Sequence, residues 1–197
     1  MTLQEYIDQI RRVLDEYETE ISFWSDEELI YWLNEGLKEV AKGAKHLTNR
    51  AYIEPTDDKE YKLPNDFIDW YKVKMNDEFI RNISITEQGE ETGFYIWGDR
   101  IFLSEYDEEG KITLYYYRAP EKMETMLDES ELPKQYEEII IPFCLYRAFM
   151  KDQKSEMANL NYNEFSQRVK AMRRRYNNEP SKTSWKVVRR WQKLNQV

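Results

Sequence analysis

The stretch that best indicates the fold is Phe94-Tyr95-Ile96-Trp97-Gly98-Asp99-Arg100-Ile101-Phe102-Leu103. Apolar and aromatic residues alternate on both sides of Gly98-Asp99, and a two-residue turn containing glycine between such runs favours a β-hairpin. The stretch therefore predicts two short antiparallel strands joined by a tight turn, and places a β-sheet in the middle of the chain.

Further strands are expected on both sides of this hairpin. Runs with strand character cover residues 51–54, 60–63, 68–75, 79–85 and 111–117. Turn residues separate the runs, as is typical of antiparallel strands. We expect a small antiparallel sheet of about five strands, an ordinary sheet size, within residues 48–118.

Helical patterns precede and follow the sheet. Four helices are predicted, over residues 2–18, 25–44, 133–151 and 155–177. A capping box marks the first helix at Thr2 and Glu5, and a second one marks the next helix at Ser25 and Glu28. The short link between these two helices indicates that they form an antiparallel pair.

Proline and serine shape the expected helices after the sheet. The third helix begins near Pro133, because proline suits a first turn. Pro142 lies inside the same helix and is expected to bend it by removing one backbone hydrogen bond. Ser155 is expected to cap the fourth helix.

These elements predict an α+β fold in which an antiparallel helical bundle of about four helices carries a small antiparallel sheet between two helix pairs. Residues 1–180 form the body, and residues 181–197 form an extended C-terminal arm. The chain of 197 residues with 41% hydrophobic residues is long enough for one core.

Charge divides the chain into two parts of opposite sign. Residues 165–197 hold ten Lys or Arg and one acid, Glu179, a formal charge of +9. Residues 1–164 hold 19 basic and 37 acidic residues, a formal charge of −18. An acidic body with a basic end is expected to attract copies of itself or an acidic partner.

The basic end also carries apolar anchors. Trp185, Val188 and Trp191 recur at three-residue spacing, so they can share one face. Seven residues are predicted to dock on a partner protein: Trp185, Lys186, Val188, Arg189, Arg190, Trp191 and Leu194. A basic helix face precedes them at Arg173, Arg174 and Arg175.

Residues suited to catalysis or to cofactors are few. His46 is the one histidine and Cys144 the one cysteine, so neither a zinc site nor an internal disulfide is expected. Cys144 lies in an apolar run and is expected to be buried, unreactive and in a reducing compartment. Glycine-rich phosphate loops are lacking. We therefore expect no enzyme, no cofactor and no metal.

Membrane insertion is not expected either. The longest apolar run, around Ile139–Tyr146, is far shorter than the roughly 20 residues of a membrane span. The opening residues lack the basic start and the apolar run of a signal peptide.

Four segments together resemble the head-to-tail adaptor, or connector, proteins of tailed bacteriophages. The segments are Phe23–Glu35 at the start of the second helix, Tyr61–Phe67 leading into the sheet, Tyr115–Pro120 at its exit, and Glu131–Glu138 at the start of the third helix. The second has the form Tyr-x-Leu-Pro-x-Asp-Phe and the fourth contains Leu-Pro-x-x-Tyr. Their order and spacing, more than any one of them, carry the resemblance.

The resemblance implies a structural virion protein in the neck of the phage particle. It implies a ring of twelve copies, a dodecamer, beneath the portal protein, with C-terminal arms that dock on the portal. A tail or stopper protein would lie below, and DNA would pass through the channel during genome ejection without specific binding. Assembly would take place in the host cytoplasm.

Two other functions stay open on the residues alone. The basic tryptophan-bearing end suits a nucleic-acid-binding module, with arginines on phosphates and indole rings stacked on bases. An acidic active site assisted by a metal would instead need several carboxylates to converge in a deep pocket. A further hypothesis is that the acidic body lines the channel and offers DNA no phosphate-binding sites.

Overall fold

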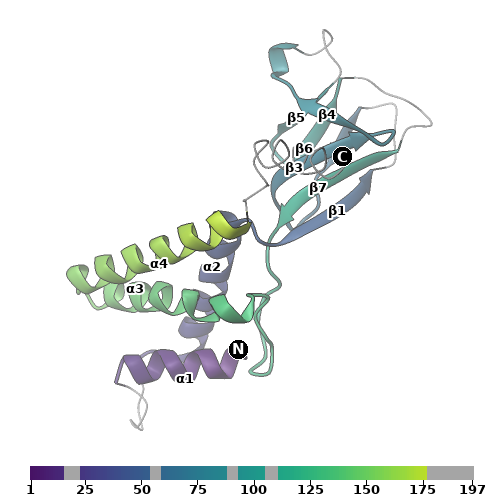
Figure 1. The fold of residues 1–197 in the computed structure, drawn as a ribbon. Coiled ribbons are helices and arrows are strands. Elements are labelled where there is room, and N and C mark those ends of the chain that lie inside the picture. Colours follow the sequence, from purple (N-terminus) through teal and green to yellow (C-terminus); the bar gives the residue numbers. More distant parts are fainter. Residues whose placement is uncertain (16–22, 54–58, 88–92, 105–110, 177–197) are drawn as a thin grey trace, which may run out of the picture. The chain divides into compact units, whose positions relative to one another are not determined.

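The computed structural model describes residues 1–15, 23–53, 59–87, 93–104 and 111–176. These ranges contain four α-helices, two 3-10 helices and seven strands (Figure 1). The chain folds as two compact units. Of the described residues, the first unit holds those within 1–36, 43–45 and 123–176, and the second holds those within 37–42 and 46–122.

The sheet is the main departure from the predicted fold. It has seven strands in the order β1-β7-β3-β4-β5-β6-β2. They are β1 Thr48–Ile53, β2 Glu60–Lys62, β3 Phe67–Met75, β4 Glu78–Asn82, β5 Gly93–Trp97, β6 Arg100–Leu103 and β7 Ile112–Arg118. The prediction of a helical bundle with a small antiparallel sheet is therefore wrong, because the described residues form a larger, curled, sheet-rich unit.

The sheet is also mixed. β4 pairs with β5 in parallel, with Arg81 opposite Gly93, whereas the other pairs are antiparallel. The short 3-10 helix η1, Ile85–Glu87, lies between these two strands in the chain. A local alternation pattern identifies strands but not their partners, so the sequence could not reveal this pair.

Alternate residues of the strands fill the core of the second unit. Val73, Phe94, Ile101 and Leu114 are fully buried, and the ring of Trp70 meets that of Phe94 edge to face at 5.3 Å between centroids. Tyr61 of β2 belongs to this core, and Ala51 and Ile53 of β1 pack against it, so the curl of the sheet brings both ends of the strand order to one apolar centre.

The predicted hairpin is confirmed. β5 and β6 pair in register, with Phe94 opposite Leu103 and Trp97 opposite Arg100. Gly98 has a φ of 62°, a left-handed conformation that a residue without Cβ adopts readily.

In the first unit, α1 covers Leu3–Val13 and α2 covers Asp26–Ala44. The capping box of Thr2 and Glu5 is complete, and the backbone N–H of Glu28 donates to Ser25 Oγ at 3.3 Å. α1 packs against α3, Ile141–Lys151, instead of lying along α2 as predicted.

The region predicted as one bent third helix is two elements. A 3-10 helix, η2, covers Lys134–Ile140, and α3 begins at Ile141. Pro142 therefore lies in the first turn of α3, where no N–H is needed, and does not bend a helix interior.

The fourth helix, α4, covers Ser155–Tyr176 and includes Ser155 as its first residue. A short link after Lys151 makes α3 and α4 an antiparallel hairpin, side by side in Figure 1. The two helices contact each other through aromatic side chains, with the ring centroids of Phe143 and Phe165 5.1 Å apart.

Gly43 marks a close approach of α2 to α4. A methyl group on Gly43 would lie 2.5 Å from Cγ1 of Val169. We expect Gly43→Ala to lower the free energy of unfolding by about 1–3 kcal/mol through overpacking, which outweighs the roughly 1 kcal/mol gained in helix propensity. Urea unfolding measures this change. Combining it with Val169→Ala should recover part of the loss, and an additive double variant would contradict the proposed clash.

Candidate functional site

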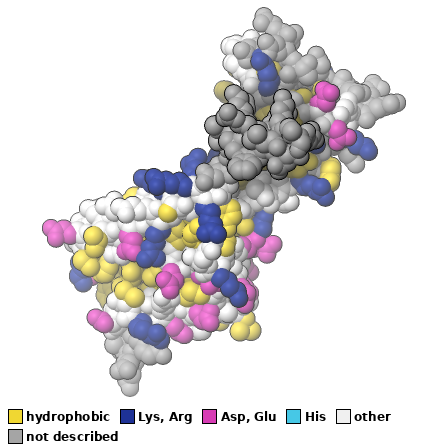
Figure 2. Space-filling model, viewed as in Figure 1, with side chains coloured by type: hydrophobic (Ala, Val, Ile, Leu, Met, Phe, Trp, Pro, Cys, Tyr) yellow, Lys and Arg dark blue, Asp and Glu magenta, His cyan; other side chains and the backbone are white. Residues whose placement is uncertain are grey.

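The last turn of α4 presents a basic surface. Arg173, Arg174 and Arg175 are consecutive and exposed, and positive charge at the C-terminal end of a helix is favourable. The opposite side of α4, with Phe165 and Val169, is buried, so the arginines extend from a fixed helix. Figure 2 shows Lys and Arg side chains over α4.

A hollow of about 700 Å³ lies beside this basic surface, between η2 and α4. It is lined by Met1, residues 134–139, Arg168 and Ala171. Two of its charged groups are paired: the Met1 ammonium pairs with Glu137, and Arg168 pairs with Glu164 at 2.6 Å. The hollow is thus lined by charged groups of both signs, part of them paired within the protein.

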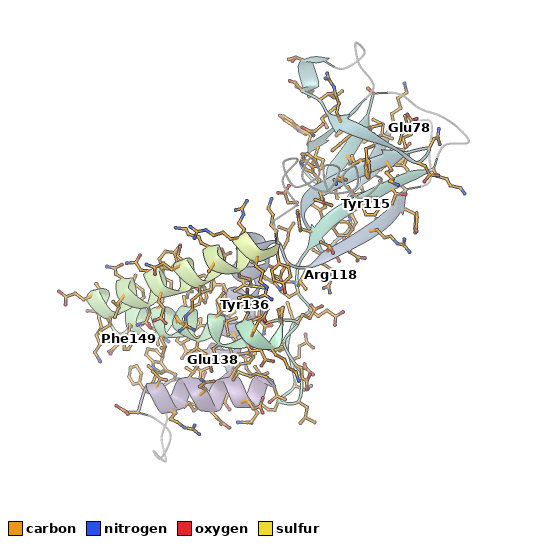
Figure 3. The ribbon with its side chains drawn as sticks, viewed as in Figure 1. Glu78, Tyr115, Arg118, Tyr136, Glu138 and Phe149 are labelled. Carbon is orange, nitrogen blue, oxygen red and sulfur yellow. The ribbon has the colours of Figure 1, made fainter. Side chains whose placement is uncertain are left out.

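Two tyrosine rings, one from α4 and one from η2, lie close together at the end of α4. Tyr176 is its last residue, and its ring centroid is 6.3 Å from that of Tyr136 on η2, near Glu138 in Figure 3. This ring contact holds the last residue of α4 close to η2. No sequence pattern indicates the pair, because Tyr136 and Tyr176 lie far apart in the chain and belong to different periodic patterns.

The structure therefore positions one part of the predicted site. Arg173, Arg174 and Arg175 share the last turn of α4. The seven predicted docking residues, in the segment 185–194, lie outside the described residues. Their docking role stays a prediction.

Tyr6 of α1 holds η2, which forms one wall of the hollow. Its hydroxyl is 2.9 Å from Ser130 Oγ and donates to the backbone oxygen of Glu137 at 3.0 Å. The side chain is fully buried, and this burial raises the pKa of Tyr6 to about 12. The neutral phenol is thus the form that the fold requires.

This raised pKa predicts a loss of stability at alkaline pH. The folded pKa lies above the unfolded value of about 10, so the stabilising contribution is complete below pH 10 and is lost between about pH 10 and 12, by roughly 2–3 kcal/mol. Tyr6→Phe should cost about 1 kcal/mol at pH 7 and fall less steeply over that window. Urea unfolding at several pH values measures both, with the exposed Tyr31→Phe as control. Parallel curves for wild type and Tyr6→Phe would contradict the assignment.

Cys144 and His46 are the residues considered for chemistry, and the structure describes both. Cys144 is fully buried, and burial raises the pKa of its thiol, so the reactive thiolate is disfavoured. His46 is half-buried. No group of three His, Cys, Asp or Glu that could hold a metal ion occurs within the described ranges. Among the same residues, no helix is long and apolar enough to cross a membrane.

Comparison with protein families adds one finding. The family described as SU10 adaptor protein matches residues 1–188. A search of curated proteins finds no match.

Proposed function

The chain belongs to the SU10 adaptor protein family, a family of phage head-to-tail adaptors, and from this membership we propose that it joins the portal of the capsid to the tail as a ring. The match over residues 1–188 is the observation that carries the proposal, because it covers nearly the whole chain. As a phage adaptor it is a virion component. We further propose a structural role in the neck, without catalysis.

The proposed assembly has twelve copies beneath the portal and a tail or stopper protein below. In this assembly the C-terminal arm, residues 181–197, extends from the end of α4 to the portal or to a neighbouring copy. The exposed Arg173, Arg174 and Arg175 continue the positive charge of the arm onto the body. Opposite charge steers the encounter, and Trp185 and Trp191 then bury their rings, which slows dissociation.

Electron microscopy of the chain, alone and mixed with portal rings, tests the proposal. We expect closed rings stacked coaxially on the portal, with a channel wide enough for duplex DNA. The acidic body predicts that self-association is weak without the portal, because like charges repel. A chain that neither forms rings nor binds the portal would overturn the proposal.

Nucleic-acid binding by the basic end is the second candidate. The three exposed arginines at the end of α4 favour it, and the charge of −18 over residues 1–164 opposes it. A DNA affinity that falls with salt and disappears after Arg189→Ala and Arg190→Ala would favour this candidate over the adaptor ring.

A further inference from the structure

One side of the sheet collects positive charges and aromatic rings. β1, β7, β3 and β4 are neighbours, and Arg50 and Lys72 both lie opposite Tyr115 of β7, which is labelled in Figure 3. Lys74 lies opposite Phe79 of β4. The adjacent residues of each strand pack into the core, so these side chains point to the other side.

We call this surface the basic aromatic face. It consists of Arg50, Tyr52, Tyr71, Lys72, Lys74, Phe79, Arg81 and Tyr115. Asp69, which lies opposite Tyr117, adds one carboxylate at one end. Four positive charges with one negative charge are unusual for a body whose formal charge is −18.

The cations and rings of this face hold one another in place. Lys72 Nζ lies 4.7 Å from the ring centroid of Tyr71, and Lys74 Nζ lies 5.0 Å from that of Phe79. Arg50 lies over Tyr52 at 5.3 Å. Such contacts restrict the long side chains but keep their charge, so a partner binds with less loss of side-chain entropy.

Large aromatic surface remains uncovered on this face. Tyr52 is 68% exposed and Phe79 is 60% exposed. Aromatic residues and arginine are enriched where proteins bind one another, and complementary charge sets the partner. The face therefore fits a protein surface that is acidic and carries an apolar projection.

The first unit of the chain carries a surface of this kind, which we call the acidic turn (residues 124–129). The Asp128 carboxylate accepts hydrogen bonds from the N–H groups of Glu124 and Thr125 at 2.7 and 2.9 Å, and from the Thr125 hydroxyl at 2.5 Å. Leu127 is 85% exposed at this turn, and Glu124 and Glu129 are exposed on either side. A fixed turn thus presents one apolar side chain between carboxylates.

We propose that the acidic turn of one copy docks on the basic aromatic face of a neighbouring copy. Leu127 would lie among the exposed rings, while Glu124 and Glu129 pair with the lysines. Because the turn and the face are different surfaces, the contact is head-to-tail, and a repeated contact of this type forms a ring when the rotation from copy to copy closes. This inference rests on the proposed adaptor ring and assigns the contact between its subunits.

Charge reversal tests the contact in four chains. The turn variant carries Glu124→Lys and Glu129→Lys, the face variant carries Lys72→Glu and Lys74→Glu, and the swap variant carries all four. The control is Lys59→Glu with Lys62→Glu, a change of the same charge outside the face. Sedimentation measures association in solution. Electron microscopy measures how many adjacent copies are bound on each portal ring. Circular dichroism checks folding.

We expect the turn variant and the face variant each to associate at least roughly tenfold more weakly than wild type, and the swap variant and the control to associate like wild type. Mixing the turn variant with the face variant should restore association, because every contact in an alternating assembly then joins opposite charges. That restoration requires a contact between copies.

Several results would overturn the inference. The first is that neither charge reversal changes association. The second is that the swap variant folds but does not associate. The third is that copies make no contact with one another, either in solution or on the portal. Duplex DNA binding that the face variant loses, with its association unchanged, would identify the face as a nucleic-acid surface instead. If the chains associate through these residues but do not join portal rings, the contact between copies is supported and the adaptor proposal is overturned.

Discussion

Deletion of residues 181–197 should leave a folded body that no longer joins the portal. The deleted segment holds five Lys or Arg, no acid, and both Trp185 and Trp191. A buried tryptophan at an interface contributes about 2 kcal/mol or more, so removal of two should weaken binding by a factor of several hundred or more. Sedimentation of the truncated chain with portal rings measures the loss.

Two smaller variants separate charge from ring burial. Arg189→Ala with Arg190→Ala should slow association and reduce its dependence on salt, whereas Trp185→Ala with Trp191→Ala should speed dissociation. Circular dichroism of each chain controls for folding. A truncated chain that attaches to the portal normally would show that the arm is not the anchor.

Phe94→Ala is expected to give the largest change in stability. Phe94 is fully buried at the centre of the curled sheet, where its ring meets Trp70. Removal of a buried phenylalanine ring leaves a cavity and typically costs about 3–5 kcal/mol. Urea unfolding of the second unit, monitored by tryptophan fluorescence, measures the loss.

Phe79→Ala is the matched control for this change. Phe79 is a phenylalanine of the same sheet but is mostly exposed, so its loss should change the unfolding free energy by less than about 1 kcal/mol. Equal effects of the two substitutions would contradict the assignment of which side of the sheet faces the core.

The hairpin over residues 94–103 is predictable from sequence because its determinants are local. Gly98 permits the turn, and the flanking alternation matches the pleat of two strands. The first capping box is predictable for the same reason, since Thr2 and Glu5 form it within one helical turn. The start and end of the sheet region also follow from local patterns.

The arrangement of the sheet depends on contacts between segments that are distant in the sequence, and the predicted arrangement is wrong. The partner of β4 is β5, in parallel, and β2 pairs with β6. These pairings depend on how the sheet curls around its core, which no alternation pattern encodes. Seven strand-like runs are present in the sequence, but an expectation based on common sheet sizes reduced them to about five.

The helices show a second limit of periodicity. The apolar pattern of α4 includes Met157 and Leu160, which are substantially exposed, while Asn161 is buried. The side-chain amide of buried Asn161 donates a hydrogen bond to the backbone oxygen of Met157 at 2.8 Å, which offsets part of the cost of its burial. A pattern based on hydrophobicity predicts such a polar residue to be exposed, although a hydrogen bond within its own helix allows it to be buried.

Only part of the candidate site is readable from sequence. The run Arg173–Arg175 is recognisable from charge alone and lies on the exposed last turn of α4. The hollow beside it is not, because η2 and α4 meet there through tertiary packing. The basic aromatic face is equally hidden, since its cations come from three strands whose order is known only from the pairing.

The pairing of the first strand with the last has a consequence for synthesis. Thr48 of β1 lies opposite Tyr117 of β7, so this edge of the sheet joins residues 69 positions apart. Contacts of such high sequence separation make folding slow, because a long loop must close first. On the ribosome, β1 remains without its partner strand until β7 has been synthesised, and an unpaired strand edge in a nascent chain is prone to aggregation.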